Sequence, residues 1–255
     1  MIGKRYMLQL AYNGANYHGW QRQPSAISVQ QALEERLSLL LNTEIELVGC
    51  GRTDTGVHAE DYYAHFEYER DFPPGFLRRF NKFLPEDIVV YQLFRLPEEV
   101  HARFSAHSRA YRYDISLKKD PFRPDTVTYY SYAAQLDQQL VLQTAALLMD
   151  YEEFLPFCKT KSDARTMRCS LSRAAWIFAE DSWAFHIQAD RFLRGMVRLI
   201  VGACLQVGRG QVPLEEVKSA LDEQRPMQGA WSAPPDGLFL SEVKYLGKSE
   251  WETLF

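Results

Sequence analysis

The sequence predicts one order of strands and helices that occurs twice along the chain. In the first half, alternating apolar residues favour strands, and apolar residues spaced three and four apart favour helices. Ser28 is a good N-cap for the first helix. The expected elements are a strand at 5–12, a helix at 28–42, strands at 44–50 and 61–69, a helix at 73–84 and a strand at 87–96. This βαββαβ order is typical of a ferredoxin-like α+β domain.

The second half repeats this order with insertions. Its expected elements are a strand at 109–117, a helix at 136–150, strands at 170–180 and 182–190, helices at 191–207 and 213–223, and a strand at 238–246. The strands on either side of Glu180 and Asp181 should form a hairpin. Sequence identity between the halves is not evident, so the repeat is one of predicted elements. The stretch from Leu155 to Cys169 receives no assignment.

Composition indicates a folded protein, at 46% hydrophobic and 24% charged residues. The first residues contain no apolar core of a signal peptide, and no apolar run approaches the length of a membrane span. We therefore expect a cytoplasmic protein without a membrane partner. The four cysteines include no CxxC pair, which fits neither a zinc site nor a dense disulfide framework.

A net charge of -4 argues weakly against a nucleic-acid partner. The cations are nevertheless clustered, and a solvated charged face is the plainer explanation of each cluster. The first cluster consists of Arg103, Arg109, Arg112, Lys118, Lys119 and Arg123, and the second of Arg191, Arg194, Arg198 and Arg209.

The segment "GRTDTGVHA" (51–59) places one aspartate, Asp54, among small residues. Asp-Thr-Gly is good turn chemistry, because the carboxylate can accept backbone N–H groups and glycine tolerates positive φ. A turn alone needs neither Arg52 before the aspartate nor His58 after it. These neighbours favour a functional carboxylate.

Three chemical interpretations of Asp54 remain open. An aspartic protease needs a second carboxylate that shares a proton with the first, which only a homodimer of this chain would supply. A metal site needs convergent ligands, and the nearby histidines have no recognised ligand spacing. They are His58, His65, His101 and His107. The third interpretation is a lone carboxylate, held ionised by arginine and directed at a sugar or base.

The segment resembles the catalytic motif of the tRNA pseudouridine synthase A family, and the resemblance spans roughly residues 5–245. Further blocks follow in the family's order. They are "YNGANYHGWQRQ" (12–23), "SVQQALE" (28–34), "NKFLPEDI" (81–88), "HARFSAHSRAYRY" (101–113), "FLRGMVRLIVG" (192–202) and "APPDGLFL" (233–240).

The resemblance implies the pseudouridine synthase fold, in which two α+β halves have sheets joined across a central cleft. Residues 1–105 would carry the aspartate loop, and residues 106–255 would complete the cleft. It also implies the reaction: a uridine of tRNA becomes pseudouridine when the C1′–N1 bond breaks, the uracil turns, and C1′ rejoins at C5. No cofactor and no metal are expected. The family acts as a homodimer on positions 38–40 of the anticodon arm.

The resemblance also assigns roles to single residues. Asp54 matches the catalytic aspartate, which either attacks covalently or deprotonates the sugar. Arg198 matches an arginine that pairs with it, and Arg52 matches one that replaces the flipped nucleotide. Tyr111 matches the tyrosine over the uracil, and Leu238 an apolar residue on the other side. Taken alone, Tyr111 and Leu238 would be core residues.

Residue spacing adds expectations about an RNA surface. On a strand, Arg109, Tyr111 and Tyr113 share one face, which places a cation beside aromatic rings. On a helix, Arg191, Arg194 and Arg198 would form one stripe. The expected RNA contacts are Arg103, Arg109, Arg112, Lys118, Lys119, Arg123, Arg191 and Arg194. The alternative functions are a non-catalytic RNA-binding protein with a degenerate site and, more remotely, an aspartic protease.

Overall fold

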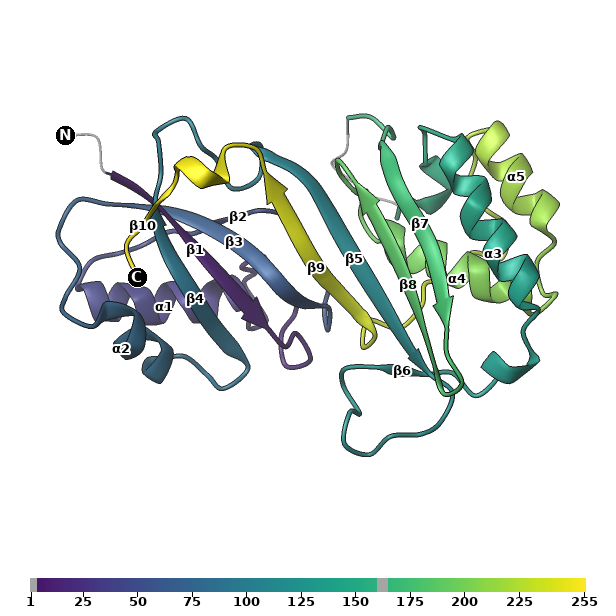
Figure 1. Ribbon diagram of the computed structural model, residues 1–255, viewed down its shortest axis with the longest axis horizontal. Helices are drawn as coiled ribbons and strands as arrows, with labels where there is room; N and C mark the ends of the chain where they lie inside the picture. Colours follow the sequence, from purple (N-terminus) through teal and green to yellow (C-terminus); the bar gives the residue numbers. More distant parts are fainter. Residues whose placement is uncertain (1–3, 160–164) are drawn as a thin grey trace. The chain divides into compact units, whose positions relative to one another are not determined.

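The structure, a computed structural model, describes residues 4–159 and 165–255 (Figure 1). The chain divides into two compact units, one of Met1–His107 with Leu240–Phe255 and one of Ser108–Phe239. The C-terminal residues pack with the first unit through β10 (Glu252–Thr253), which pairs with β4 (Ile88–Arg95). The division into domains 1–105 and 106–255 stays a prediction.

The first unit has the expected βαββαβ order, and its strands pair antiparallel. β1 (Lys4–Tyr12) lies between β3 (His58–Tyr68) and β4, and the short β2 (Val48–Gly49) pairs with β3. The helices are α1 (Val29–Leu41) and α2 (Phe76–Phe83), which lie together beside these strands in Figure 1. The strand order β4-β1-β3-β2 is that of a ferredoxin-like sheet.

The second unit has the same order with insertions. β8 (Ser182–Ala189) pairs antiparallel with β5 (Ala106–Ser116) and with β7 (Leu171–Phe178), and β6 (Thr128–Tyr129) pairs parallel with β5. The predicted hairpin is confirmed, because Ala179 N–H donates to Ser182 O at 2.9 Å. Its helices are α3 (Gln138–Leu147), α4 (Met196–Gly208) and α5 (Leu214–Asp222). β9 (Leu238–Tyr245) follows them as the last strand of the repeated order, and from Leu240 onward it belongs to the first unit.

Each unit has its own apolar core. In the first, Phe76 and Phe80 of α2 are fully buried and stack at a ring-centroid distance of 5.7 Å. In the second, α4 is apolar on almost every side, and Ile200, Val201 and Cys204 have no exposed surface. A helix that is apolar all round is a buried helix. The mixed α+β architecture with mainly antiparallel strands is therefore confirmed, while the expected cleft stays a prediction.

Several predicted boundaries are wrong, and β3 and β5 each begin three residues before their expected starts. The strand expected at 44–50 is reduced to Val48–Gly49. The helices expected at 73–84 and 191–207 begin only at Phe76 and Met196. Each begins after a glycine in the left-handed region, Gly75 at φ +64° and Gly195 at φ +71°. Such a residue does not continue a right-handed helix, so the chain before it is not helical.

The late start of α4 corrects one further prediction. Arg191 and Arg194 precede the helix, so they do not form a helical stripe with Arg198. The turn before α4 closes with a bond from Met196 N–H to Leu193 O at 3.1 Å. The apolar spacing that suggested a longer helix belongs instead to this turn.

The unassigned stretch from Leu155 to Cys169 includes a 3₁₀ turn at Leu155–Phe157, whose Phe157 is buried. Residues 160–164 lie outside the described part of the chain. On either side of them, Phe154 N–H donates to Met167 O at 3.0 Å, and Lys159 N–H donates to Arg194 O at 3.0 Å. The stretch is thus attached to the segment that leads into α4.

Candidate active site

Asp54 lies in a tight turn between β2 and β3 and is half-buried. Its carbonyl oxygen accepts the N–H of Val57 at 3.2 Å, and Gly56 within the turn has φ +77°. Arg52 is exposed, whereas Thr53 between them is buried. The turn expected for Asp-Thr-Gly is therefore present, and it leaves the aspartate partly accessible.

The segment from Tyr12 to Trp20 holds this turn from several sides. The hydroxyl of Tyr12 lies 2.9 Å from Thr53 Oγ1, and Trp20 N–H donates to Thr53 O at 3.4 Å. Tyr17 O accepts the N–H of Gly56 at 3.2 Å. These contacts fix the backbone on both sides of Asp54.

His58 is a structural part of this arrangement. Its side chain is 1% exposed, and its Nδ1 accepts the N–H of Gly14 at 3.0 Å. An accepting Nδ1 carries no proton, so this hydrogen bond selects the tautomer with its proton on Nε2. His58 therefore ties the Gly14 segment to the start of β3.

Gly19 shows how closely the two segments approach. A Cβ atom at this position would lie 2.3 Å from Thr53 O, and φ is +81°. Both the space and the backbone conformation require glycine here. The chain around Asp54 is consequently packed backbone against backbone.

A buried carboxylate orients the chain that enters β2. Glu34 of α1 is 5% exposed and accepts the N–H of Leu47 at 2.9 Å. Gln30 donates to Glu34 Oε1 and to Leu47 O, both at 2.9 Å, and Arg22 lies 3.2 Å from Glu34 Oε2. These bonds satisfy the charge of Glu34 and join α1 to the residues that precede β2.

In the second unit, the predicted face of β5 is confirmed. Regular pairing of β5 with β8 puts Arg109, Tyr111 and Tyr113 on one side of the strand. Tyr111 is half-buried and packs edge to face against Phe192, with the ring centroids 5.1 Å apart. The guanidinium of Arg109 donates to Asp190 O at 2.9 Å. Burial raises the pKa of Tyr113 more than any other effect does, so the side chain of Tyr113 stays a neutral hydroxyl.

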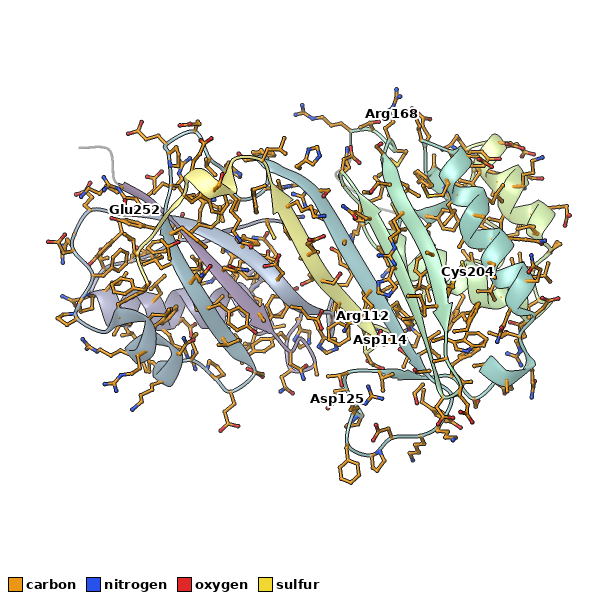
Figure 2. All side chains as sticks on the ribbon, viewed as in Figure 1. Arg112, Asp114, Asp125, Arg168, Cys204 and Glu252 are labelled. Carbon is orange, nitrogen blue, oxygen red and sulfur yellow. The ribbon has the colours of Figure 1, made fainter. Side chains whose placement is uncertain are left out.

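Arg112 lies on the opposite side of β5 and forms an ion pair. Its Nε contacts Asp114 Oδ1 at 3.0 Å and Oδ2 at 2.9 Å, and its guanidinium lies 4.8 Å from the centre of the Phe239 ring. Figure 2 labels Arg112 and Asp114 next to each other on the sheet. A role for Arg112 in RNA binding stays a prediction.

Arg198 is held by the chain that leads to Leu238. Its Nε donates to Ala233 O at 2.6 Å, and its own carbonyl oxygen accepts the N–H of Ala233 at 3.0 Å. Leu238 is 4% exposed, and its N–H donates to Pro235 O at 2.8 Å. Arg198 and the segment before Leu238 are thus positioned together.

The remaining predicted RNA contacts are at or near the surface. Lys118 pairs with Asp181 at 2.7 Å, and Arg123 pairs with Asp120 at 3.0 Å. Figure 2 places Asp125 in the loop that joins β5 to β6, which contains Arg123. The others are Arg103, Lys119 and Arg194, which are exposed, and Arg191, which is half-buried.

Sequence reasoning missed the residues that support the site. Glu34, Gln30 and Tyr12 were parts of family blocks without a role of their own. The signal for Glu34 is a carboxylate on the apolar side of α1, among Leu33 and Leu37, which are fully buried. A charged residue in such a place must have partners.

In residues 4–159 and 165–255, no three or more His, Cys, Asp or Glu side chains gather as a metal-binding group. Within the same residues, no helix has both the length and the apolar character to cross a bilayer.

Comparison with known proteins covers nearly the whole chain. A family described as tRNA pseudouridine synthase matches residues 149–246. The tRNA pseudouridine synthase A of Parabacteroides distasonis is 42% identical over 95% of this chain and 96% of its own. That of Bacteroides fragilis is 40% identical over 96% and 98%, and that of Haemophilus ducreyi is 37% identical over 93% and 92%. The motif around Asp54, its fixed turn and these full-length similarities together establish that the chain belongs to the tRNA pseudouridine synthase A family.

Proposed function

We propose that this protein isomerises uridine to pseudouridine in tRNA, at positions 38–40 of the anticodon arm. The observation that supports the proposal most is the fixed, half-buried turn of Asp54 within the family motif. In the reaction the C1′–N1 bond breaks, the uracil turns, and a C1′–C5 bond forms. The hydrogen on C5 is lost and N1 gains one, so the product is an isomer of the substrate.

Asp54 is the proposed catalytic group. Its carboxylate either attacks the sugar covalently or deprotonates it, and both routes need a carboxylate held at a defined place. The hydrogen bonds to Thr53 and Gly56 meet that need, because they fix the backbone immediately beside Asp54. A stacked base hides its glycosidic bond, so the nucleotide must leave the helix first.

Four other residues complete the proposed site. Arg52 takes the place of the extruded nucleotide, which suits an exposed arginine two residues before Asp54. Tyr111 and Leu238 are proposed to contact the uracil, and Arg198 to support the ionised carboxylate. We also propose RNA contacts by the basic residues predicted from the sequence, a homodimer as the working assembly, and a cytoplasmic location, where tRNA is modified.

Two alternatives lead to different results. A non-catalytic RNA-binding protein would bind tRNA without changing it, and an aspartic protease would cleave peptides. The intact set of Arg52, Asp54, Tyr111 and Arg198 favours the enzyme, because binding alone does not require a carboxylate near phosphates.

The test is the incubation of purified protein with an unmodified tRNA transcript, in buffer with no added cofactor, followed by chemical mapping of pseudouridine. We expect modification at uridines within 38–40 and none when these are replaced by cytidine. Pseudouridine elsewhere would refute the proposed positions. An unmodified transcript would refute the activity. Light scattering checks the assembly, since a dimer has twice the 29.6 kDa of one chain.

A further inference from the structure

A group of aromatic rings, two of them exposed and the third, Tyr130, half-buried, lies in the second unit, apart from the residues that the family motif explains. The aromatic cluster consists of Tyr130, Tyr132 and Trp231, with Arg209 beside it. The ring of Tyr130 is 6.0 Å from that of Tyr132 and 6.5 Å from that of Trp231. The guanidinium of Arg209 lies 3.8 Å from the centre of the Tyr132 ring. Tyr132 is 42% exposed and Trp231 is 37% exposed.

Trp231 is held in place by its own backbone. The segment 229–233 runs along one face of α4, in the opposite direction. Gln206 Nε2 donates to Gly229 O at 2.9 Å, and a Cβ on Gly202 would lie 1.9 Å from Trp231 O. The segment ends in the two hydrogen bonds between Ala233 and Arg198. The indole is thus partly exposed on a fixed backbone.

The face of α4 that carries this segment also relates the cluster to Arg198. Arg198, Gly202, Gln206 and Arg209 are spaced by four, four and three residues, which places them on one side of a helix. At 1.5 Å per residue, Arg209 lies about 16 Å along the axis from Arg198. The cluster therefore stands at a set distance from the arginine proposed to support the Asp54 carboxylate.

The chemistry of the cluster fits a nucleobase. Aromatic rings stack on bases of any sequence, and a neighbouring arginine adds attraction to the base and its phosphate. Tyrosine, tryptophan and arginine are also enriched at protein interfaces, so a second copy of the chain is the competing occupant that the test must exclude. A base is favoured because Arg209 lies directly beside the rings, where its charge can meet the phosphate of the stacked nucleotide.

We propose that the aromatic cluster binds an unpaired base of the same RNA that carries the target uridine. The inference rests on the proposed function and adds a second contact site to it. Stacking on Trp231 and Tyr132 would hold that base while Asp54, supported by Arg198, acts on the target uridine. The cluster would then contribute to affinity for RNA and not to the chemical step.

Tryptophan fluorescence offers a direct readout. The chain has five tryptophans. Trp20, Trp176, Trp183 and Trp251 are between 2% and 6% exposed, so Trp231 alone among them is open to a stacking base. An anticodon stem-loop oligonucleotide is titrated into Asp54→Asn, which prevents turnover. We expect the RNA to quench the tryptophan fluorescence until binding is saturated. The quenching should disappear in the double variant Asp54→Asn with Trp231→Phe, which keeps an aromatic ring at position 231 and therefore still binds RNA.

Affinity provides the second readout. Removal of one stacking ring, in Trp231→Ala or Tyr132→Ala, should weaken binding of the oligonucleotide by roughly 5- to 150-fold. Tyr91 on β4 is the matched control, since it is a 52% exposed tyrosine, and Tyr91→Ala should bind as the parent does. Circular dichroism confirms that each variant is folded. If Trp231→Ala is not folded, Trp231→Phe still provides the test.

Several results would overturn the inference. These are quenching that persists after Trp231→Phe, unchanged affinity in Tyr132→Ala, or a fluorescence change that follows protein concentration without RNA, which would assign the cluster to a second copy of the chain. If the wild type forms pseudouridine but RNA does not quench Trp231, the inference fails and the proposed function stands. If the wild type neither binds nor modifies tRNA, both fail.

Discussion

At the scale of single residues, the position of Asp54 depends on glycine at position 19. Both Gly19 and Gly75 have positive φ, at +81° and +64°. Only Gly19 meets a neighbour, since its Cβ would lie 2.3 Å from Thr53 O, whereas nothing lies within 4 Å of a Cβ at Gly75. A side chain at Gly75 therefore introduces backbone strain alone, whereas a side chain at Gly19 adds a steric collision with Thr53.

We predict that Gly75→Ala costs roughly 1 kcal/mol of stability, the cost of the left-handed conformation. Gly19→Ala should cost about 2–4 kcal/mol, because the neighbouring backbone must also move. It should lower kcat under conditions where both variants are fully folded. Urea unfolding and single-turnover kinetics measure the two effects. Equal stability and equal kcat in the two variants would contradict the described packing.

At this scale the sequence suggests candidates for the reactive residues but not for the residues that support them. Asp54 and Arg52 stand in a motif whose chemistry can be argued from residue types. The contact of Gly19 with Thr53 joins distant parts of the chain, so local sequence patterns do not predict it. The same holds for Glu34, whose partners Arg22 and Leu47 become neighbours only in the fold.

At the scale of elements, β3 contains a buried histidine that makes stability depend on pH. His65 is 5% exposed, and its Nδ1 accepts the N–H of Ala102 at 3.1 Å. Burial, then the charges of His101 and Arg5, lower its pKa to about 4. An unfolded histidine has a pKa near 6.5, so the unfolded chain binds this proton at a higher pH than the folded one.

The sign of the effect follows from that difference. Stability from His65 is complete above about pH 6.5 and is lost as the pH falls towards 4, by up to about 3 kcal/mol. Asparagine can accept the same N–H without titrating, so His65→Asn should flatten the dependence of the unfolding free energy on pH between 4.5 and 6.5. His18 is exposed, and His18→Asn should keep the wild-type curve. An unchanged curve in His65→Asn would show that His65 does not cause this pH dependence.

The elements also show what periodicity can predict. Alternation marks β8, where buried residues alternate with less buried ones. β1 and β3 are buried on both faces at residues 6–8 and 62–66, so apolar and aromatic content marks them better than alternation does. Helical spacing fails at the starts of α2 and α4, because Gly75 and Gly195 interrupt a helical pattern that continues through them. Alternation overextends β2, because the apolar residues Ile45 and Leu47 are buried without strand pairing.

At the scale of the whole molecule, the net charge of -4 conflicts with a tRNA substrate only if charge is spread evenly. Affinity depends on the local neutralisation of phosphates, so cations on one surface suffice. Lys119 and Lys218 are both exposed lysines of the second unit. Only Lys119 belongs to a predicted RNA contact.

We predict that Lys119→Ala weakens tRNA binding and lowers the slope of log affinity against log salt by about 1, the value expected for one lost phosphate contact. Lys218→Ala should change neither quantity. The chemical step on bound tRNA should be the same in both variants. Affinity of the wild type that does not respond to salt would contradict a phosphate-binding surface.

Asp54 is the group proposed to carry out the isomerisation, and hydrogen release from the uracil tests this role directly. Rejoining C1′ to C5 displaces the hydrogen on C5, so a tRNA with tritium at C5 of its uridines reports each event. We predict that the wild type releases tritium in step with pseudouridine formation, whereas Asp54→Asn binds the same tRNA with similar affinity and releases none. Tritium release by Asp54→Asn at a rate near that of the wild type would contradict the assignment.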